Sequence, residues 1–180
     1  MNTSLKAQKL KEYLKLGKTD LCHNILSKAS EEDLSDALFL QLANETERVR
    51  GNRNKALVYA ELLQKKYPDL PLGYAKVAQD LLALGYLNQA IETVEKIIRR
   101  HPENRLLLEV AAQSYRERGD YFKALEHSRA LIKISPDRLI GFHYASKDLL
   151  KLNKYTECIH TTRDGLARHK GDLYLLQLGI

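Results

Sequence analysis

Three prolines divide this chain at equal intervals, because Pro68, Pro102 and Pro136 are each 34 residues apart. Glycine follows the same period, with asparagine in the fifth place, at Gly17, Gly51, Gly85, Gly119 and Asn153. A third column holds only small residues, namely Cys22, Ala56, Ala90, Ala124 and Cys158. A period of this length is typical of architectures in which each unit is one supersecondary structure that buries its apolar face against its neighbours.

Each column has a physical cause. Glycine, or asparagine in its place, adopts the left-handed conformation that ends a helix. Small residues let two helices approach closely, and proline marks where a second helix has already ended. Each unit is therefore predicted to be a helix, a turn and a second helix. The expected helix pairs are 3–16 with 19–29, 37–50 with 53–66, 71–84 with 87–100, 105–118 with 121–134, and 139–152 with 155–168. Ser30 followed by three acidic residues also allows the third helix to begin earlier, near residue 31.

The pattern resembles the tetratricopeptide repeat, a helical hairpin of about 34 residues. Unit 71–104 carries the diagnostic residues Tyr74, Ala78, Leu81, Gly85, Ala90 and Pro102, and unit 105–138 carries Leu108, Ala112, Tyr115, Gly119, Ala124 and Pro136. Other units depart from it: Glu47 stands where a large apolar residue is usual, Asn44 is in the small column, and Lys170 replaces the proline. The resemblance implies an all-α, right-handed superhelix forming one array, with repeats at 3–36, 37–70, 71–104, 105–138 and 139–172 and a partial repeat at 173–180.

The two ends of the array differ in polarity. The first helix is mostly polar, as expected of a terminal repeat, whereas residues 173–180 read LYLLQLGI and are largely apolar. Leu173 and Leu176 continue the repeat register, so this segment is expected to begin another repeat, with the natural chain continuing, or to pack on another subunit. Self-association through Leu173–Ile180 is one hypothesis, and a short final helix folded onto the array is the alternative.

Composition narrows the class of protein. The chain has 180 residues, 44% of them hydrophobic, and a formal net charge of +6. The two cysteines fall in the small packing column, which favours buried, unreactive thiols over a disulfide framework. The N-terminal segment lacks the apolar core of a signal peptide and no run of about 18 apolar residues occurs, so a cytoplasmic protein without a membrane span is expected.

The sequence contains no glycine-rich phosphate loop, paired-cysteine metal motif or nucleophile elbow. His160 and Asp164 lie four residues apart on a helix, a spacing that favours a surface pair over a catalytic one. We therefore expect no enzyme activity, cofactor or metal within these residues, although a catalytic domain could follow residue 180. Basic runs fall at the ends of second helices, where cations complement the helix dipole, so nucleic-acid binding is not favoured.

The resemblance implies a concave groove lined by the first helix of each repeat. The side chains expected to face it are polar and mixed in charge, and the candidate partner-binding residues are Lys76, Gln79, Gln113, Arg116, His143, Tyr144 and Lys147. Gln41, Glu45 and Glu109 fall in the same columns. Some members of the family bind the C-terminal carboxylate of chaperones through a specific set of Lys, Asn and Arg side chains. Gln79 and Ala75 stand where that set needs other residues, so binding of chaperone C-termini is not predicted.

The leading hypothesis is a non-catalytic scaffold that binds a protein or peptide segment through this groove. A second hypothesis makes the chain the N-terminal module of a larger bacterial enzyme, such as a glycosyltransferase, sulfotransferase or capsule-polymer synthase. A third and weaker one is RNA binding through the positive charge.

Overall fold

The computed structural model describes residues 2–178, and all of the regular secondary structure in that range is helical. The first helices of the successive hairpins are α1 (Thr3–Lys15), α3 (Ala37–Val49), α5 (Pro71–Ala83), α7 (Arg105–Glu117) and α9 (Leu139–Lys151). The second helices are α2 (Thr19–Leu26), α4 (Arg53–Lys66), α6 (Leu87–Ile98), α8 (Tyr121–Ile134) and α10 (Tyr155–Arg168). A single 3₁₀ turn, η1 (Asp33–Ser35), precedes α3, and α11 (Leu173–Leu178) follows α10. The predicted all-α class is confirmed.

The helix boundaries follow the predicted pairs closely. The expected start of the third helix at residue 37 is confirmed, because α3 begins at Ala37, and the alternative start near residue 31 is wrong. The backbone of Asp36 is extended, and its carboxylate accepts a hydrogen bond from Phe39 N at 2.7 Å, which caps the helix there. The acidic run after Ser30 forms the separate turn η1 instead.

The turn inside each hairpin has the geometry that the glycine column predicts. Positive φ angles occur in this column at Gly17, Gly51, Gly85, Gly119 and Asn153. The residue after each of them donates a backbone hydrogen bond to a carbonyl five positions earlier, as Tyr86 N does to Leu81 O at 2.9 Å. This is the Schellman arrangement, which satisfies carbonyl groups at the end of the first helix.

The small column lies where the two helices of a hairpin cross. Cys22, Ala56, Ala90, Ala124 and Cys158 are all buried. Both cysteines are free thiols, and their sulfurs donate to backbone carbonyls of Leu10 at 3.8 Å and Ser146 at 3.4 Å. The prediction of buried packing cysteines is confirmed.

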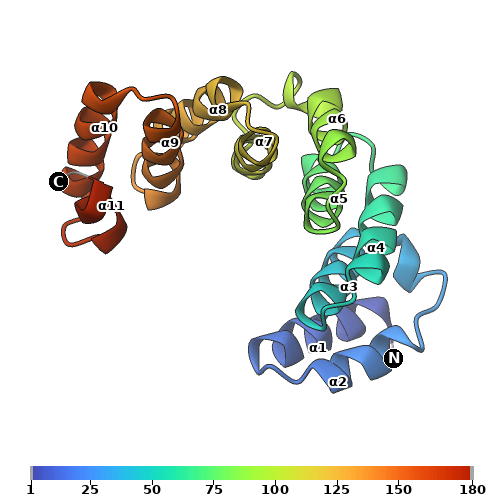
Figure 1. The fold of residues 1–180 in the computed structure, drawn as a ribbon. Coiled ribbons are helices and arrows are strands. Elements are labelled where there is room, and N and C mark those ends of the chain that lie inside the picture. Colours follow the sequence, from blue (N-terminus) through green and yellow to red (C-terminus); the bar gives the residue numbers. More distant parts are fainter. Residues whose placement is uncertain (1, 179–180) are drawn as a thin grey trace. The chain divides into compact units, whose positions relative to one another are not determined.

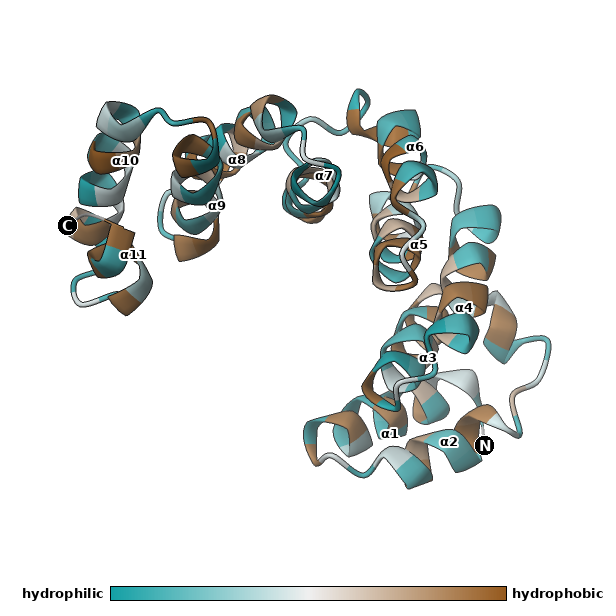
Figure 2. Cartoon of the chain, in the orientation of Figure 1, coloured by the Kyte–Doolittle hydropathy of each residue, from teal (hydrophilic) through white to brown (hydrophobic). Residues whose placement is uncertain are grey.

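The chain divides into two compact units, the first ending at Thr93 and the second beginning at Val94, within α6. In the first unit α1, α2, α3 and α4 follow one another as antiparallel hairpins (Figure 1) around a core that includes Leu10, Phe39 and Leu42. In the second unit α8, α9 and α10 pack around Leu125, Ala145 and Leu149. Individual helices carry both hydrophilic and hydrophobic segments, as expected when one face is buried (Figure 2).

A second period, of two repeats, is superimposed on the first. The third place of the repeat holds Phe39 and Leu107 in alternate units, and Gly73 and Gly141 in the units between them. A Cβ on Gly73 would lie 2.8 Å from Gln64 Cα, and one on Gly141 would lie 2.9 Å from Ile132 N. These glycines therefore let α5 lie directly against α4, and α9 against α8. Repeats 37–70 and 71–104, and likewise 105–138 and 139–172, are joined by the same close approach.

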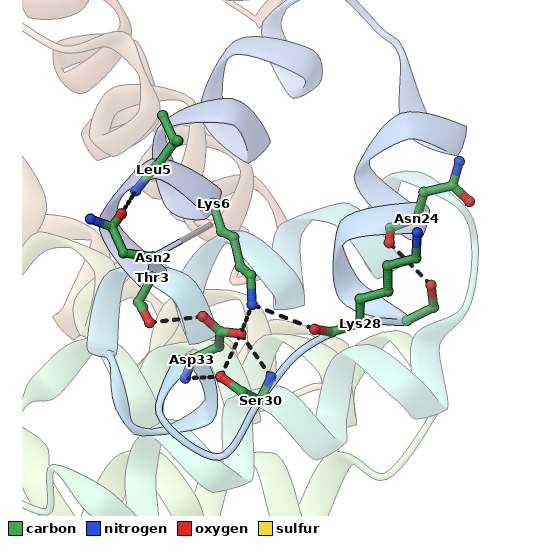
Figure 3. A network of polar contacts seen from close by, with 9 residues as sticks. Asn2, Thr3, Leu5, Lys6, Asn24, Lys28, Ser30 and Asp33 are labelled. Atoms are coloured by element: carbon green, nitrogen blue, oxygen red, sulfur yellow. Dashed lines mark hydrogen bonds and ion pairs between the residues drawn. The ribbon is translucent and has the colours of Figure 1, made fainter.

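The N-terminal hairpin is held by a polar cluster around Asp33 (Figure 3). This buried carboxylate accepts hydrogen bonds from Thr3 Oγ1 at 2.8 Å and from Ser30 N at 2.7 Å, and it forms an ion pair with Lys6. Burial alone would raise the pKa of Asp33, but the hydrogen bonds from Lys6, Ser30 and Thr3 outweigh it and hold that pKa well below its usual range. The cluster joins the start of α1 to η1.

Because the pKa of Asp33 is lower in the folded chain, its contribution to stability is present above the unfolded value and is lost as pH falls below it. We predict that Asp33→Asn lowers the free energy of unfolding by about 2–3 kcal/mol at neutral pH. As the pH falls below about 4, the free energy of unfolding of the variant should also decrease less than that of the unmodified chain. Urea unfolding at pH 7 and pH 3 checks this prediction, with the exposed Asp20→Asn as control. An equal loss at both pH values would contradict the assigned role of the charge.

The segment after residue 172 folds back onto the last hairpin. Leu175 is fully buried, and its Cδ1 occupies the space beside Gly165, where an added Cβ would be only 2.7 Å away. Asp172 caps α11 by accepting from Leu175 N at 3.0 Å. Leu173 and Leu176 stay exposed, at 75% and 43%. The helix predicted for this segment is therefore present through Leu178, whereas Ile180 lies outside the described residues.

Candidate functional site

In each compact unit, the first helices of neighbouring hairpins share a surface that we call the first-helix wall of that unit. In the first unit, a hollow of about 370 Å³ lies against α1 and α3. Its lining includes Gln41 and Glu45, which the repeat register predicts, together with the apolar side chains Leu14, Leu38 and Val49. Leu38 and Val49 are exposed at 48% and 62%. The first-helix wall of this unit is therefore more apolar than the polar columns of the repeat predict.

In the second unit, a hollow of about 490 Å³ lies against α7 and α9, and we call it the α7–α9 hollow. It is lined by Gln113, Arg116, Glu117, Tyr121, Tyr144, Lys147 and Lys151. Four of the seven predicted contact residues therefore come together here. The hollow contains amide, guanidinium, phenol and ammonium groups, so it can hydrogen-bond an extended polar chain and can oppose negative charge.

The α7–α9 hollow is built on a buried ion pair. Arg116 Nε donates to Asp148 Oδ1 at 2.6 Å, and its second nitrogen donates to Oδ2 at 2.8 Å. Asp148 also accepts from Ser128 Oγ at 3.0 Å, and its side chain is fully buried. The guanidinium carbon of Arg116 lies 4.2 Å from the ring centroid of Tyr144. Two carboxylate bonds and one aromatic face thus fix the Arg116 side chain between α7, α8 and α9.

The same pair occurs two repeats earlier in the first unit. Arg48 Nε lies 3.2 Å from the buried carboxylate of Asp80, but the other end of the guanidinium donates to Gln79 at 2.8 Å. Asn44 supplies the remaining bond, from Nδ2 to Asp80 Oδ2 at 2.5 Å. Burial raises the pKa of Asp80, because only part of its charge is met by hydrogen bonds. Gln79, predicted as a contact residue, is thus partly occupied within the chain.

Lys76 and His143, the remaining predicted contact residues, are not among the residues that line the α7–α9 hollow. Lys76 is on α5, where burial and the nearby Arg48 lower the pKa of its ammonium group. His143 Nε2 lies 2.8 Å from Asp172 Oδ1, and its ring centroid is 4.8 Å from that of Tyr174. His143 therefore helps to hold α11 against α9.

Sequence reasoning missed residues that complete the α7–α9 hollow. Lys151 and Tyr121 line it, while Asp148 and Ser128 hold Arg116 from below. The sequence does contain a pattern that indicates the buried ion pair. Arginine at positions 48 and 116, and aspartate at positions 80 and 148, have the same two-repeat spacing as the glycines. Read as columns, these four residues predict an ion pair in alternate repeats.

We predict that Arg116→Met lowers the free energy of unfolding by about 3–5 kcal/mol, because it leaves Asp148 buried without its counter-ion. The double variant Arg116→Met with Asp148→Leu should recover most of that loss. Chemical denaturation followed by circular dichroism measures both. The control Arg129→Met removes an arginine from the exposed pair with Glu157 and should leave the denaturation midpoint unchanged. Equal effects at positions 116 and 129 would show that burial of the pair contributes nothing.

The described part of the chain shows two further features relevant to function. No group of three or more His, Cys, Asp or Glu side chains between residues 2 and 178 is arranged to hold a metal ion. None of the helices in that range is long and apolar enough to cross a membrane. His160 and Asp164 are both exposed.

Repeated helical hairpins with glycine turns and a small crossing column are the features of the tetratricopeptide-repeat (TPR) fold, and this chain has that fold. The model of the family described as anaphase-promoting complex, cyclosome, subunit 3 matches residues 83–164, which is less than half of the chain. The predicted relationship to TPR proteins is confirmed.

Several solved structures share the fold. TTC0263, a thermophilic TPR protein of Thermus thermophilus, is 20% identical, with a TM-score of 0.77 over 98% of this chain and 97% of its own. YrrB, a TPR protein with an unusual peptide-binding site, is 12% identical, with a TM-score of 0.73 over 96% and 89%. In the hetero-tetramer Cut9–Hcn1 of the anaphase-promoting complex, the matching chain is 15% identical, with a TM-score of 0.80 over 99% of this chain and 36% of its own.

Proposed function

We propose that this chain is a non-catalytic TPR scaffold that binds an extended protein segment on its first-helix wall, with the α7–α9 hollow as the main point of contact. The observation that carries the proposal is the convergence of Gln113, Arg116, Tyr144 and Lys147 on one hollow. YrrB, whose fold is similar, has a peptide-binding site, which supports the general mode.

The charges of the hollow favour an acidic segment. Arg116 is neutralised by Asp148, and Glu117 accepts a hydrogen bond from Gln113 at 2.9 Å. Lys147 and Lys151 are exposed, and neither forms an ion pair with another residue of the described range. Their ammonium groups are therefore available to carboxylates of a partner, with Glu117 as the only opposing charge in the lining.

Pre-organisation supports the same conclusion. The buried bonds to Asp148 and the stacked Tyr144 hold the floor of the hollow rigid before any ligand arrives. Burial raises the pKa of Tyr144, so its hydroxyl stays protonated and can donate at neutral pH. A site that is already ordered loses less side-chain entropy on binding.

We predict that short extended peptides rich in Asp and Glu bind at least tenfold more tightly than matched neutral peptides. The double variant Lys147→Gln with Lys151→Gln should remove this preference and its salt dependence, because the two ammonium charges are gone. Calorimetric titration of both peptide sets at low and moderate salt measures the effect. Lys133→Gln, which removes an exposed lysine from α8, is the matched control. Unchanged selectivity in the double variant, or equal loss in the control, would dismiss the hollow as the binding surface.

A further inference from the structure

A second hollow, of about 490 Å³, lies in the first compact unit against α2, η1, α3 and α4, and we call it the Glu47 pocket. It shares no lining residue with the two hollows of the first-helix wall. Its wall is largely apolar, with side chains that include Leu26, Leu34, Val58 and Leu62. Two charged side chains belong to the lining: the carboxylate of Glu47, whose side chain is only 2% exposed, and the ammonium group of Lys55, which is exposed to solvent.

The pocket exists because a large residue is missing from the repeat pattern. The eleventh place of the other repeats holds Tyr13, Leu81, Tyr115 and Leu149. At the position two repeats after Glu47, Tyr115 stacks on His127 with ring centroids 5.5 Å apart and donates to Glu95 at 2.6 Å.

The counterparts of His127 and Glu95 in the earlier repeats are Tyr59 and Ser27, and both line the pocket. In the later repeat, the ring of Tyr115 fills the space that corresponds to the open pocket beside Glu47. An occupant of about the size of one aromatic ring fits this space.

Glu47 Oε1 and His23 Nδ1 face each other in the pocket without a hydrogen bond between them. Glu47 Oε2 accepts from Asn52 Nδ2 at 2.7 Å, whereas Oε1 lies 3.6 Å from His23 Nδ1, too far for a hydrogen bond. His23 Nδ1 is itself buried and has no hydrogen-bond partner in the described part of the chain. A buried carboxylate with an unfilled acceptor site is costly, and it is stabilised when a charged donor reaches it.

We propose that the Glu47 pocket binds an organic cation, an ammonium or guanidinium group carried on an apolar body of about ring size. The N–H groups donate to Glu47 Oε1 and, when His23 is neutral, to His23 Nδ1. The apolar body packs against Leu26, Leu34 and Val58. Burial and the charge of Glu47 raise the pKa of Tyr59, so the phenol remains neutral and adds no second negative charge.

The probe set holds shape constant and varies charge: benzylammonium, benzyl alcohol and benzoate. Nuclear magnetic resonance titrations follow the methyl signals of Leu26, Leu34 and Val58. We expect saturable shifts at these methyls with benzylammonium, at least tenfold weaker binding of benzyl alcohol, and no binding of benzoate. Equal affinity of the alcohol and the ammonium would overturn the proposal, because the carboxylate would then select nothing.

Two variants separate binding from folding. Glu47→Gln keeps the shape and removes the charge, so the preference for benzylammonium should fall at least tenfold, while the exposed Glu61→Gln on α4 should retain it. Glu47→Leu restores the usual apolar residue, so it should raise the melting temperature and abolish binding. A Glu47→Gln protein that folds and keeps the full preference overturns the proposal, as does binding that survives in Glu47→Leu.

The cation can come from a free amine or from an arginine side chain of a protein. N-acetyl-arginine amide distinguishes these sources: tighter binding than benzylammonium indicates a protein side chain, and weaker binding indicates a small amine. Either result supports the cation site, and failure of both probes overturns it. Acidic peptides bound at the α7–α9 hollow should be unaffected by Glu47→Gln, so this proposal and the proposed scaffold function fail independently.

Discussion

The side chain of Asp148 is charged and fully buried, so it destabilises the packing of α9 beside α7 unless Arg116 donates to both carboxylate oxygens. This requirement fixes the distance and the register between the first helices of two consecutive repeats. An apolar interface of the same size would tolerate small slips, whereas a two-bond ion pair does not. The α7–α9 hollow takes its shape from this constraint, because Arg116 forms part of its lining and Tyr144 stacks on Arg116.

The four repeats between residues 37 and 172 form two similar pairs. The Arg–Asp pair and the close-approach glycines at the third place both recur at a spacing of two repeats. Yet the two copies are not equivalent. Arg48 divides its donors between Asp80 and Gln79, and Glu47 stands where the later pair has Tyr115. The earlier pair of repeats thus has a looser polar network and an open pocket at the positions where the later pair is filled.

Much of the fold could be predicted from the sequence because each repeat column has a local cause. A glycine at positive φ ends a helix wherever it occurs, and a proline excludes helix continuation, so the boundaries could be read from single positions. The start of α3 was left open between residues 37 and 31, because Ser30 and the acidic residues after it also fit a helix cap. In the structure Asp36 caps α3, and Asp33 belongs to the separate turn η1.

The candidate site was predicted less completely. Register placed Gln113, Arg116, Tyr144 and Lys147 on one wall, but it could not show that Arg116 is anchored by a residue 32 positions away or that His143 turns toward Asp172. Glu47 was visible as a departure from the repeat pattern. The pocket that results from this departure is lined by residues of α2, η1, α3 and α4, so it could not be predicted from one repeat position.

The binding surface is tested most directly by mapping where an acidic peptide binds, from the amide chemical shifts of the labelled protein during a titration. If the peptide occupies the α7–α9 hollow, saturable shifts are expected at Gln113, Glu117, Tyr144 and Lys147 on α7 and α9, with the exposed faces of α8 and α10 unchanged. Shifts concentrated on the exposed faces of α8 and α10, or no saturable shift at all, would contradict the assignment of the first-helix wall as the binding surface.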